Sequence, residues 1–457
     1  MTAAEAAPRA DSIWSARYAG VTLGAVALIF LAAIEALAVT TVMPVVSAEL
    51  HGESLYAVAF AGTLATGVIG MVATGAWCDR AGPRLPVYTA TALFVVGLVI
   101  AGSATDMTVF LIGRLVQGLG AGGQTVALYV VVARLYPSRL HGAIFGAFAA
   151  AWVVPSMIGP FLAGAVTEYL HWRWMFLGVA VLALLALLLV ALRLHGVDLG
   201  QGEAEGTRGI GSRLMLAVVV AVAAVAVGLA VDAPPQWRWP GAVLAVAVIG
   251  VAILPLLPRG TLRAGKGLPS VILMRGLVAG AFFAAEAYIP YALMDRFAFP
   301  PTLAGLALTG AALAWSGASW LQGRIGDRLG STRIAVISLA AVLAGVLIVL
   351  ATVSVPLPPW LIVVGWTFAG GGMGLVYPRL NVLMLAYSTR GNEGFHSSAL
   401  SIADSTGSAV ALAVAGLLFG AAAAGAAAFS AVFLLSIAML LIALLPGLRL
   451  GNPPLRD

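Results

Sequence analysis

The chain has 457 residues, of which 61% are hydrophobic and only 9% are charged, whereas about a quarter of the residues in soluble domains carry charge. This composition excludes a water-soluble fold and predicts an all-α integral membrane protein, because runs of about 20 apolar residues cross a bilayer as helices. The net charge is +6, but the basic residues lie mainly in short segments between such runs, and this placement argues against nucleic acid as a partner. A single cysteine, Cys78, allows no intrachain disulfide and gives no sign of a metal cluster.

Apolar runs predict six transmembrane helices before a polar interval and six at the end of the chain. The first six are expected at residues 19–45, 55–77, 86–104, 108–134, 140–167 and 173–194. A polar interval, 195–213, is expected to be a cytoplasmic linker, and the runs 214–231 and 240–258 form a predicted hairpin. The last six are expected at residues 268–291, 300–322, 334–354, 358–387, 394–420 and 423–446. The sequence thus predicts fourteen spans in three parts: an N-terminal six-helix bundle (1–194), a linker with two extra helices (195–267) and a C-terminal six-helix bundle (268–457).

Basic residues lie mainly in segments that share one side of this topology. Since Lys and Arg are enriched in cytoplasmic loops, both termini are predicted to be cytoplasmic. The first 18 residues are expected to be a cytoplasmic tail and not a cleaved signal peptide. The bias toward Ala, Gly and Arg, with Lys266 as the one lysine, indicates a bacterial source and hence a bacterial cytoplasmic membrane.

A loop motif occurs twice in the chain. GAWCDRAGPR (75–84) returns as GRIGDRLGSTR (323–333), and each copy joins the second and third predicted helices of its set. Glu35 and Glu286 occupy similar places in the opening helices of the two sets. Two related halves are typical of secondary transporters, whose binding site lies between the halves near the bilayer midplane.

These motifs resemble the major facilitator superfamily, and in particular its fourteen-span drug:proton antiporter branch. In the fourth predicted helix, the segment 114–120 is similar to the pattern R-x-x-Q-G-x-G. The fifth resembles a glycine- and proline-rich antiporter pattern, although Pro155 and Ala163 stand where that pattern has glycines. The helix-packing positions implied are Gly118, Gly146, Pro155, Gly159 and Pro160. The resemblance implies a major-facilitator-like fold of two six-helix bundles and a central two-helix hairpin, working by alternating access.

The resemblance also implies that the aspartate of the repeated loop motif takes part in the conformational switch. The candidate gating residues are Asp79, Arg80, Asp327 and Arg328. Ordinary anchoring of basic side chains at the inner membrane face is the alternative interpretation of the two arginines.

Charged side chains within the predicted spans are functional hypotheses, because a charge at the bilayer centre costs about 2.5–3.5 kcal/mol. The candidates for proton coupling are Glu35, Arg114, Glu286 and Asp404. Glu35 and Arg114 lie at comparable depths, so bundle packing could bring them together. A carboxyl that moves between an arginine and an apolar cavity can bind and release a proton. The alternatives are a permanent ion pair at Glu35 and, at Glu286, either an acid that attracts a cationic substrate or a neutral hydrogen-bonded carboxyl. Asp404 lies among small residues that suit tight packing or a water-lined path.

Polar and aromatic side chains in the spans are candidates for lining a substrate pocket, since such pockets combine apolar walls with a few polar groups. They are Gln117, Gln124, Tyr129, Trp152, Tyr288, Trp315, Tyr377 and Asn381. For each of them, contact with lipid or a neighbouring helix is the alternative.

The sequence contains no P-loop, H-E-x-x-H or C-x-x-C motif, so no enzymatic activity and no cofactor are expected. We expect a monomeric secondary transporter whose partners are protons, a small molecule and membrane lipids. Proton-coupled export of an apolar or amphiphilic compound is the leading hypothesis. Two alternatives stay open: export of a lipid or cell-envelope precursor, and proton-coupled uptake by symport.

Overall fold

The computed structural model describes residues 12–51, 56–200, 210–229, 233–299, 301–355, 357–422 and 425–451. Within these ranges the chain forms fifteen α-helices and no β-strand, which confirms the all-α prediction. The long apolar runs of the sequence form the helices because a helix satisfies every backbone N–H and C=O group internally, as a bilayer interior requires.

The helices lie close to their expected bounds, with one exception. The first group is α1 (Ala19–Glu49), α2 (Tyr56–Ala81), α3 (Arg84–Gly102), α4 (Met107–Leu135), α5 (Ser138–Ala150), α6 (Val153–Tyr169) and α7 (Arg173–Leu194). The next two are α8 (Ile210–Leu229) and α9 (Pro235–Ala252), followed by the 3₁₀ turns η3 (Leu254–Leu256) and η4 (Thr261–Arg263). The last group is α10 (Leu268–Phe297), α11 (Pro301–Leu329), α12 (Ser331–Ser354), α13 (Trp360–Ala386), α14 (Glu393–Ala421) and α15 (Ala426–Leu448).

The exception is the fifth predicted span, 140–167, which the structure divides into α5 and α6. The break falls at Ala151 and Trp152, just before Pro155. Proline lacks a backbone N–H, and its ring collides with the carbonyl four residues earlier in a continuous helix. One straight helix across this segment was therefore a wrong prediction, and Pro155 is the physical reason.

Eleven of the described helices are long and apolar enough to cross a membrane. The protein is therefore a multi-span membrane protein. The helices α2 and α11 and the α5–α6 pair fall outside that set of eleven. Each of α5 and α6 is short, and α11 is rich in Gly, Ser and Thr.

The same pattern of helix pairing occurs in both groups of helices. In the first, α4 packs against α2 and α3, and α7 against α1 and α3. In the last, α13 packs against α11 and α12, and α15 against α10 and α12. Glycines make the closest approaches possible: a Cβ on Gly120 of α4 would overlap the backbone of Phe94, and one on Gly370 of α13 would overlap that of Ala311.

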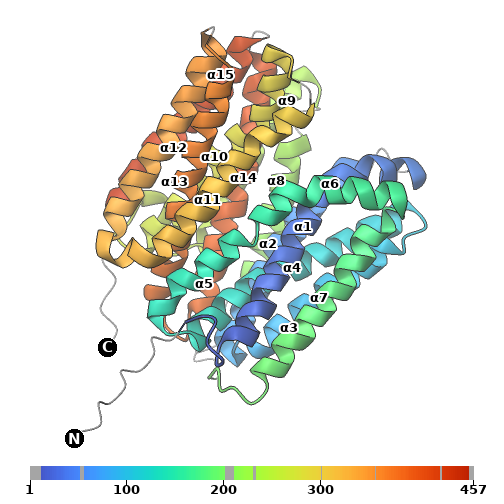
Figure 1. Cartoon of the computed structure of the whole chain (residues 1–457), viewed down its shortest axis with the longest axis vertical. Coiled ribbons are helices and arrows are strands. Elements are labelled where there is room, and N and C mark those ends of the chain that lie inside the picture. The colour runs from blue at the N-terminus through green and yellow to red at the C-terminus, as the bar shows by residue number, and fades with distance from the viewer. Residues whose placement is uncertain are drawn as a thin grey trace, which may run out of the picture.

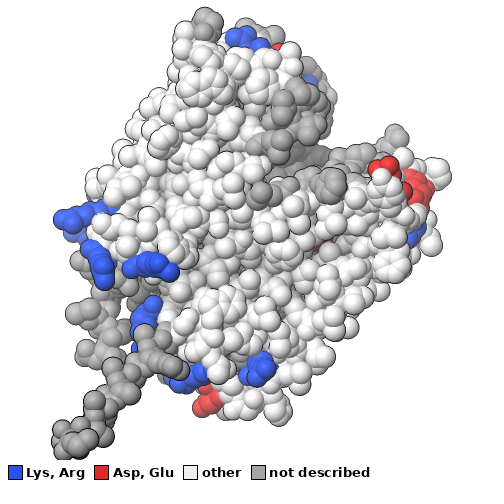
Figure 2. Space-filling model, in the orientation of Figure 1, with Lys and Arg blue, Asp and Glu red and all other residues white. Residues whose placement is uncertain are grey.

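The two bundles, α1–α7 and α10–α15, meet at one end of the molecule and diverge toward the other (Figure 1). They touch where α14 packs on α2 and α4, and where α5 packs on α11 and α13. Gly75 faces Gly394 at the first of these seams, and Gly142 faces Gly323 at the second. We call this the closed end and the opposite one the open end. A hollow separates the two lobes toward the open end (Figure 2).

The hairpin α8–α9 lies along the α2–α14 seam. Helix α8 packs against both α2 and α14, and α9 packs against α8 and α14. Small side chains form a local apolar cluster there, including Ala223 of α8, Ala245 of α9 and Ala413 of α14. The hairpin therefore contacts both bundles.

Candidate functional site

A buried ion pair joins α1 and α4 within the N-terminal bundle. Arg114 Nη1 donates to Glu35 Oε1 and also, at 2.6 Å, to Gln117 Oε1. The side chains of Arg114 and Glu35 are only 5% and 7% exposed to solvent. Arg114 lies seven residues from the start of α4 at Met107, about 10 Å from the open end at about 1.5 Å per residue. The sequence placed these residues at similar depths, and the structure brings them together.

A second cluster joins three helices of the C-terminal bundle: Arg275 of α10, Asp404 of α14, and Tyr377 and Asn381 of α13. We call it the Asp404 network. Asp404 Oδ1 accepts hydrogen bonds from Arg275 Nε at 2.6 Å and from the Tyr377 hydroxyl at 2.8 Å. Arg275 Nη1 also lies 3.4 Å from the Tyr377 carbonyl and 3.4 Å from Asn381 Oδ1, and its guanidinium carbon lies 3.5 Å from the Tyr377 ring centroid.

The Asp404 network faces the other bundle. Tyr129 of α4, in the other bundle, lies near Asn381, Arg275 and Asp404. Its ring packs against Phe145 of α5, with centroids 5.1 Å apart. The Asp404 side chain keeps 25% of its exposure, against 8% for Arg275. Its carboxylate is therefore the part of the network that solvent reaches.

The Glu35–Arg114 and Asp404–Arg275 ion pairs lie near opposite ends of the molecule. Arg275 is seven residues from the start of α10 at Leu268, about 10 Å from the closed end at about 1.5 Å per residue. Arg114 lies a similar distance from the open end. Sequence reasoning did not assign a role to Arg275, because nothing in one sequence shows that α10, α13 and α14 meet around it.

Glu286 belongs to neither pair. It is half-buried on α10, beside the indole of Trp366. The indole N–H has no hydrogen-bond partner among the described residues. Among the residues that the structure describes, Glu286 has no cationic partner within ion-pair distance. Its position in the sequence resembles that of Glu35, but its surroundings do not.

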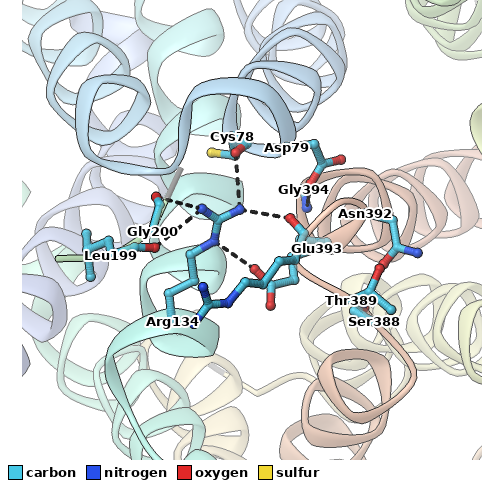
Figure 3. Close-up of polar contacts among 12 residues, drawn as sticks. Cys78, Asp79, Arg134, Leu199, Gly200, Ser388, Thr389, Asn392, Glu393 and Gly394 are labelled. Atoms are coloured by element: carbon cyan, nitrogen blue, oxygen red, sulfur yellow. Dashed lines mark hydrogen bonds and ion pairs between the residues drawn. The ribbon is translucent and has the colours of Figure 1, made fainter. Parts of the chain in front are cut away.

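Polar contacts fasten the two bundles together at the closed end (Figure 3). Asp79, at the end of α2, accepts the backbone N–H groups of Gly394 at 2.6 Å and Phe395 at 2.8 Å. These donors are in the first turn of α14, where unpaired N–H groups and the helix dipole attract a carboxylate. Gly394 must be glycine here, because a Cβ would overlap the carbonyl oxygen of Gly75.

Arg134, at the end of α4, also connects the two bundles at the closed end (Figure 3). Its Nε donates to Glu393 Oε2 at 2.9 Å, and its Nη2 donates to the carbonyls of Arg390 at 2.9 Å and Cys78 at 3.3 Å. Its Nη1 reaches the linker, at the carbonyl of Gly200, 3.2 Å away. We call Asp79, Arg134, Glu393 and the N–H groups of 394–395 the closed-end clasp. Sequence reasoning found only Asp79 of this set.

The other gating candidates lie in different places. Arg80 is half-buried, and its Nη2 has no hydrogen-bond partner among the described residues. Arg328 is exposed at the end of α11, while the side chain of Asp327 lies outside the described residues. The second motif copy is thus at the α5–α11 seam, where Gly323 packs against Gly142.

The remaining pocket and packing candidates are dispersed. Gln124 donates to the Leu28 carbonyl at 3.3 Å, and Trp315 packs edge-on against Tyr377 with centroids 5.0 Å apart. Tyr288 contacts Phe419, and Trp152 is exposed at the α5–α6 break.

The candidate helix-packing residues lie between helices or at the start of α6. Gly118 packs against Thr63 and Thr66, Gly146 against Ser319, and Gly159 against Leu37. Pro155 is buried at the start of α6, and the side chain of Pro160 is outside the described residues.

The sequence matches the Major Facilitator Superfamily over residues 25–208 and 271–457. The gap between the matched segments, 209–270, contains the hairpin α8–α9. Solved structures agree in fold. The TM-score is 0.69 with a bacterial homologue of the iron transporter ferroportin in an outward-facing state (12% identity, covering 93% of this chain and 98% of that one). It is 0.66 with the human organic anion transporter MFSD10 (16% identity, 92% and 99%).

Curated relatives match over shorter segments. The Acurin A biosynthesis cluster MFS-type transporter of Aspergillus aculeatus is 32% identical over 146 residues, 32% of this chain and 26% of that protein. The MFS efflux transporter aclA of Aspergillus oryzae is 35% identical over 147 residues, 32% and 26%. An uncharacterized MFS-type transporter of Mycobacterium tuberculosis is 34% identical over 136 residues, 30% and 20%. The chain thus spans about a quarter of the length of the curated relatives it matches.

Proposed function

Because the chain belongs to the major facilitator superfamily, we propose that it is a secondary transporter that exports a small apolar or amphiphilic compound in exchange for protons. The observation that carries this proposal is a carboxylate paired with arginine deep in the molecule, yet accessible to solvent between two bundles that meet at one end. An acid in such a place can take up a proton from one side and release it to the other as the bundles move.

The proposal places both termini in the cytoplasm and the closed end at the cytoplasmic face. Lys and Arg gather near the end of the molecule where α1 begins and α15 ends (Figures 1 and 2), and cytoplasmic loops are the ones enriched in these residues. The structure then represents the outward-facing state. The hairpin and the α5–α6 pair complete fourteen crossings of the cytoplasmic membrane, with 1–194 and 268–457 as the moving parts.

Alternating access requires the closed-end clasp to break. The Asp79 and Arg134 contacts join α2 and α4 of one bundle to α14 of the other, so rotation of the bundles toward an inward-facing state separates every pair. Such contacts bias a two-state equilibrium without touching the substrate. They are the gate in this proposal.

The proton is assigned first to Asp404 and second to Glu35. Asp404 is accessible to solvent at the interface between the bundles, whereas Glu35 is buried inside one bundle with Arg114. Tyr377 and Asn381 border the same space, and they and Trp315 are the proposed contacts for the cargo.

The test is transport in proteoliposomes with an imposed pH gradient and the fluorescent amphiphilic dye Hoechst 33342. We expect wild-type protein to move dye against its gradient while protons flow the opposite way, and Asp404→Asn to abolish this coupled movement. Dye movement together with protons would instead identify an uptake symporter. A gradient-independent transfer of fluorescent lipid between leaflets, without dye transport, would favour the lipid-exporter alternative.

Coupled transport by Asp404→Asn at the wild-type rate would remove Asp404 from the proposal. The same assay on Glu35→Gln decides whether the second carboxyl is also needed. If neither carboxyl is needed, proton coupling by these acids is wrong.

A further inference from the structure

An open apolar groove lies between the two helices of the hairpin. Six apolar side chains line it: Leu216 and Val219 of α8, and Ala247, Val248, Val251 and Ala252 of α9. The groove lies toward the closed end, because Ile210 and Arg213 in the first turn of α8 line a small cavity together with Asp79 of the closed-end clasp. We call it the hairpin groove. In a bilayer, its apolar walls suit a hydrocarbon chain.

A compact turn rich in basic residues, 258–267, follows the hairpin. The N–H of Gly265 donates to the carbonyl of Gly260 at 3.0 Å, and Arg449, just after α15, donates from Nη1 to the carbonyl of Ala264 at 3.2 Å. The turn exposes three cations, which are Arg259, Arg263 and Lys266. Among the described residues, none of the three forms an ion pair. We call this segment the basic turn; its hydrogen bonds hold three unpaired positive charges close together.

The basic turn adjoins the end of the hairpin groove. Helix α9 ends at Ala252, and η3 (Leu254–Leu256), which follows it, packs against both α8 and α9. Arg259 comes three residues after η3, so at most about 11 Å of chain separates them. Leu254 and Leu262, on either side of Arg259, are 51% and 53% exposed. Exposed leucines among cations are typical of a segment at the boundary between membrane and water.

We propose that the hairpin groove and the basic turn together bind one anionic phospholipid. Its phosphate headgroup pairs with Arg259, Arg263 and Lys266, and one of its acyl chains lies in the groove. Basic residues beside transmembrane helices recognise anionic headgroups in this way, whereas a zwitterionic headgroup brings no net charge to neutralise the three cations. In the proposed orientation the closed end faces the cytoplasmic leaflet, where anionic lipids are found.

The proposed lipid site belongs to the part of the chain between the two bundles. The segments that match the superfamily leave out residues 209–270, which contain both the groove and nearly all of the basic turn. Helix α8 packs on α2, whereas η4 of the basic turn packs on α10. A lipid bound to both parts therefore connects the hairpin to the C-terminal bundle.

The test is native mass spectrometry of the detergent-purified full-length protein with phosphatidylglycerol or phosphatidylcholine of the same acyl chains. We expect wild-type protein to bind phosphatidylglycerol about tenfold more tightly. A triple variant of the basic turn should lose this preference: Arg259→Gln, Arg263→Gln and Lys266→Gln. The matched control removes three exposed or half-buried cations where α11 ends and α12 begins, and it should keep the preference: Arg324→Gln, Arg328→Gln and Arg333→Gln.

A second pair of variants tests the groove with the cations intact. Val251 lines the groove and is 71% exposed, whereas Val243, eight residues earlier on α9, is 64% exposed and lies outside it. We expect Val251→Phe to narrow the groove and to weaken phosphatidylglycerol binding several-fold. The same substitution at Val243 should leave binding at the wild-type value.

Three outcomes would overturn the lipid site. Equal affinity of wild-type protein for the two lipids would remove the role of the cations. Equal losses in the two triple variants would show diffuse attraction to positive charge and not a site. Displacement of phosphatidylglycerol by an equal concentration of glycerol 3-phosphate would show that the basic turn binds a free anion. The measurement involves no transport, so failure of lipid binding leaves the proposed function intact, and failure of dye transport leaves the lipid site intact.

Discussion

The open end and the closed end of this protein differ in whether their ion pairs lie within one bundle or between the two. At the open end, Glu35 pairs with Arg114, and Glu49 pairs with Arg173, both within the N-terminal bundle. At the closed end, Arg134 pairs with Glu393 across the two bundles. Contacts within a bundle persist when the bundles rotate, whereas contacts between them must break. Contacts within a bundle therefore set the stability of that bundle, and contacts between the bundles set the conformation.

The largest expected effect is on stability, from Arg114→Met. It leaves Glu35 buried without a cation, which costs about 3–5 kcal/mol when one partner of a buried pair is removed. We expect a large fall in the melting midpoint of the purified protein, followed by tryptophan fluorescence. We expect little change in Cys78 labelling, the rate at which N-ethylmaleimide modifies the thiol of Cys78, which is buried at the closed end. The double variant Glu35→Leu with Arg114→Met should recover much of the loss, because both charges are gone. A rise in Cys78 labelling of about tenfold or more, equivalent to about 1.4 kcal/mol, would show that this pair controls the conformation and not only the stability of one bundle.

A conformational effect of intermediate size is expected from Gly394→Ala. The added Cβ would overlap the carbonyl oxygen of Gly75, so the closed end cannot form as it stands. We expect Cys78 labelling to rise by about tenfold, equivalent to about 1.4 kcal/mol, with a smaller change in melting midpoint than Arg114→Met. The matched control is Gly142→Ala at the other seam, where the Cβ would lie 3.5 Å from the Cα of Gly323. Equal labelling of both variants would contradict the steric argument.

The smallest effect is expected from Glu49→Gln at the open end. The Arg173 guanidinium beside Glu49 holds the pKa of that carboxyl below its usual value of 4.5. A lowered pKa means that the pair contributes stability above pH 4.5 and loses it as the pH falls further. The Glu49 side chain is 40% exposed, and exposed pairs contribute less than about 1 kcal/mol.

The melting midpoint of Glu49→Gln should therefore lie slightly below that of wild type at pH 7, and the difference should shrink as the pH falls below 4.5. A difference that does not shrink would show that the glutamine disturbs packing and not charge.

Much of the helical framework could be predicted from the sequence. Apolar length and charge placement located nearly all helices, because the bilayer forces each long apolar run to satisfy its own backbone. The exception at α5–α6 was also visible in principle, since Pro155 is in the sequence. The carboxyls at Glu35 and Asp404 could be singled out for the same reason: a charge in an apolar run is costly and conspicuous.

The partners of those charges were harder to predict. Arg114 was paired correctly with Glu35 because both lie at similar depths of helices in one bundle. Arg134 and Glu393 are 259 residues apart in the chain, and each stands at a helix end where a basic or acidic residue is ordinary. Nothing in the neighbourhood of either residue indicates the other.

The amino-acid sequence alone shows that this chain crosses a membrane many times, that its two halves repeat a motif, and which acids lie in apolar surroundings, since each of these properties is local to a run of residues. The folded structure was needed to show that α14 begins against Asp79, that Arg275 holds Asp404, and that Tyr129 lies near them from the opposite bundle. These contacts depend on how helices distant in sequence pack together, and packing is a property of the whole fold.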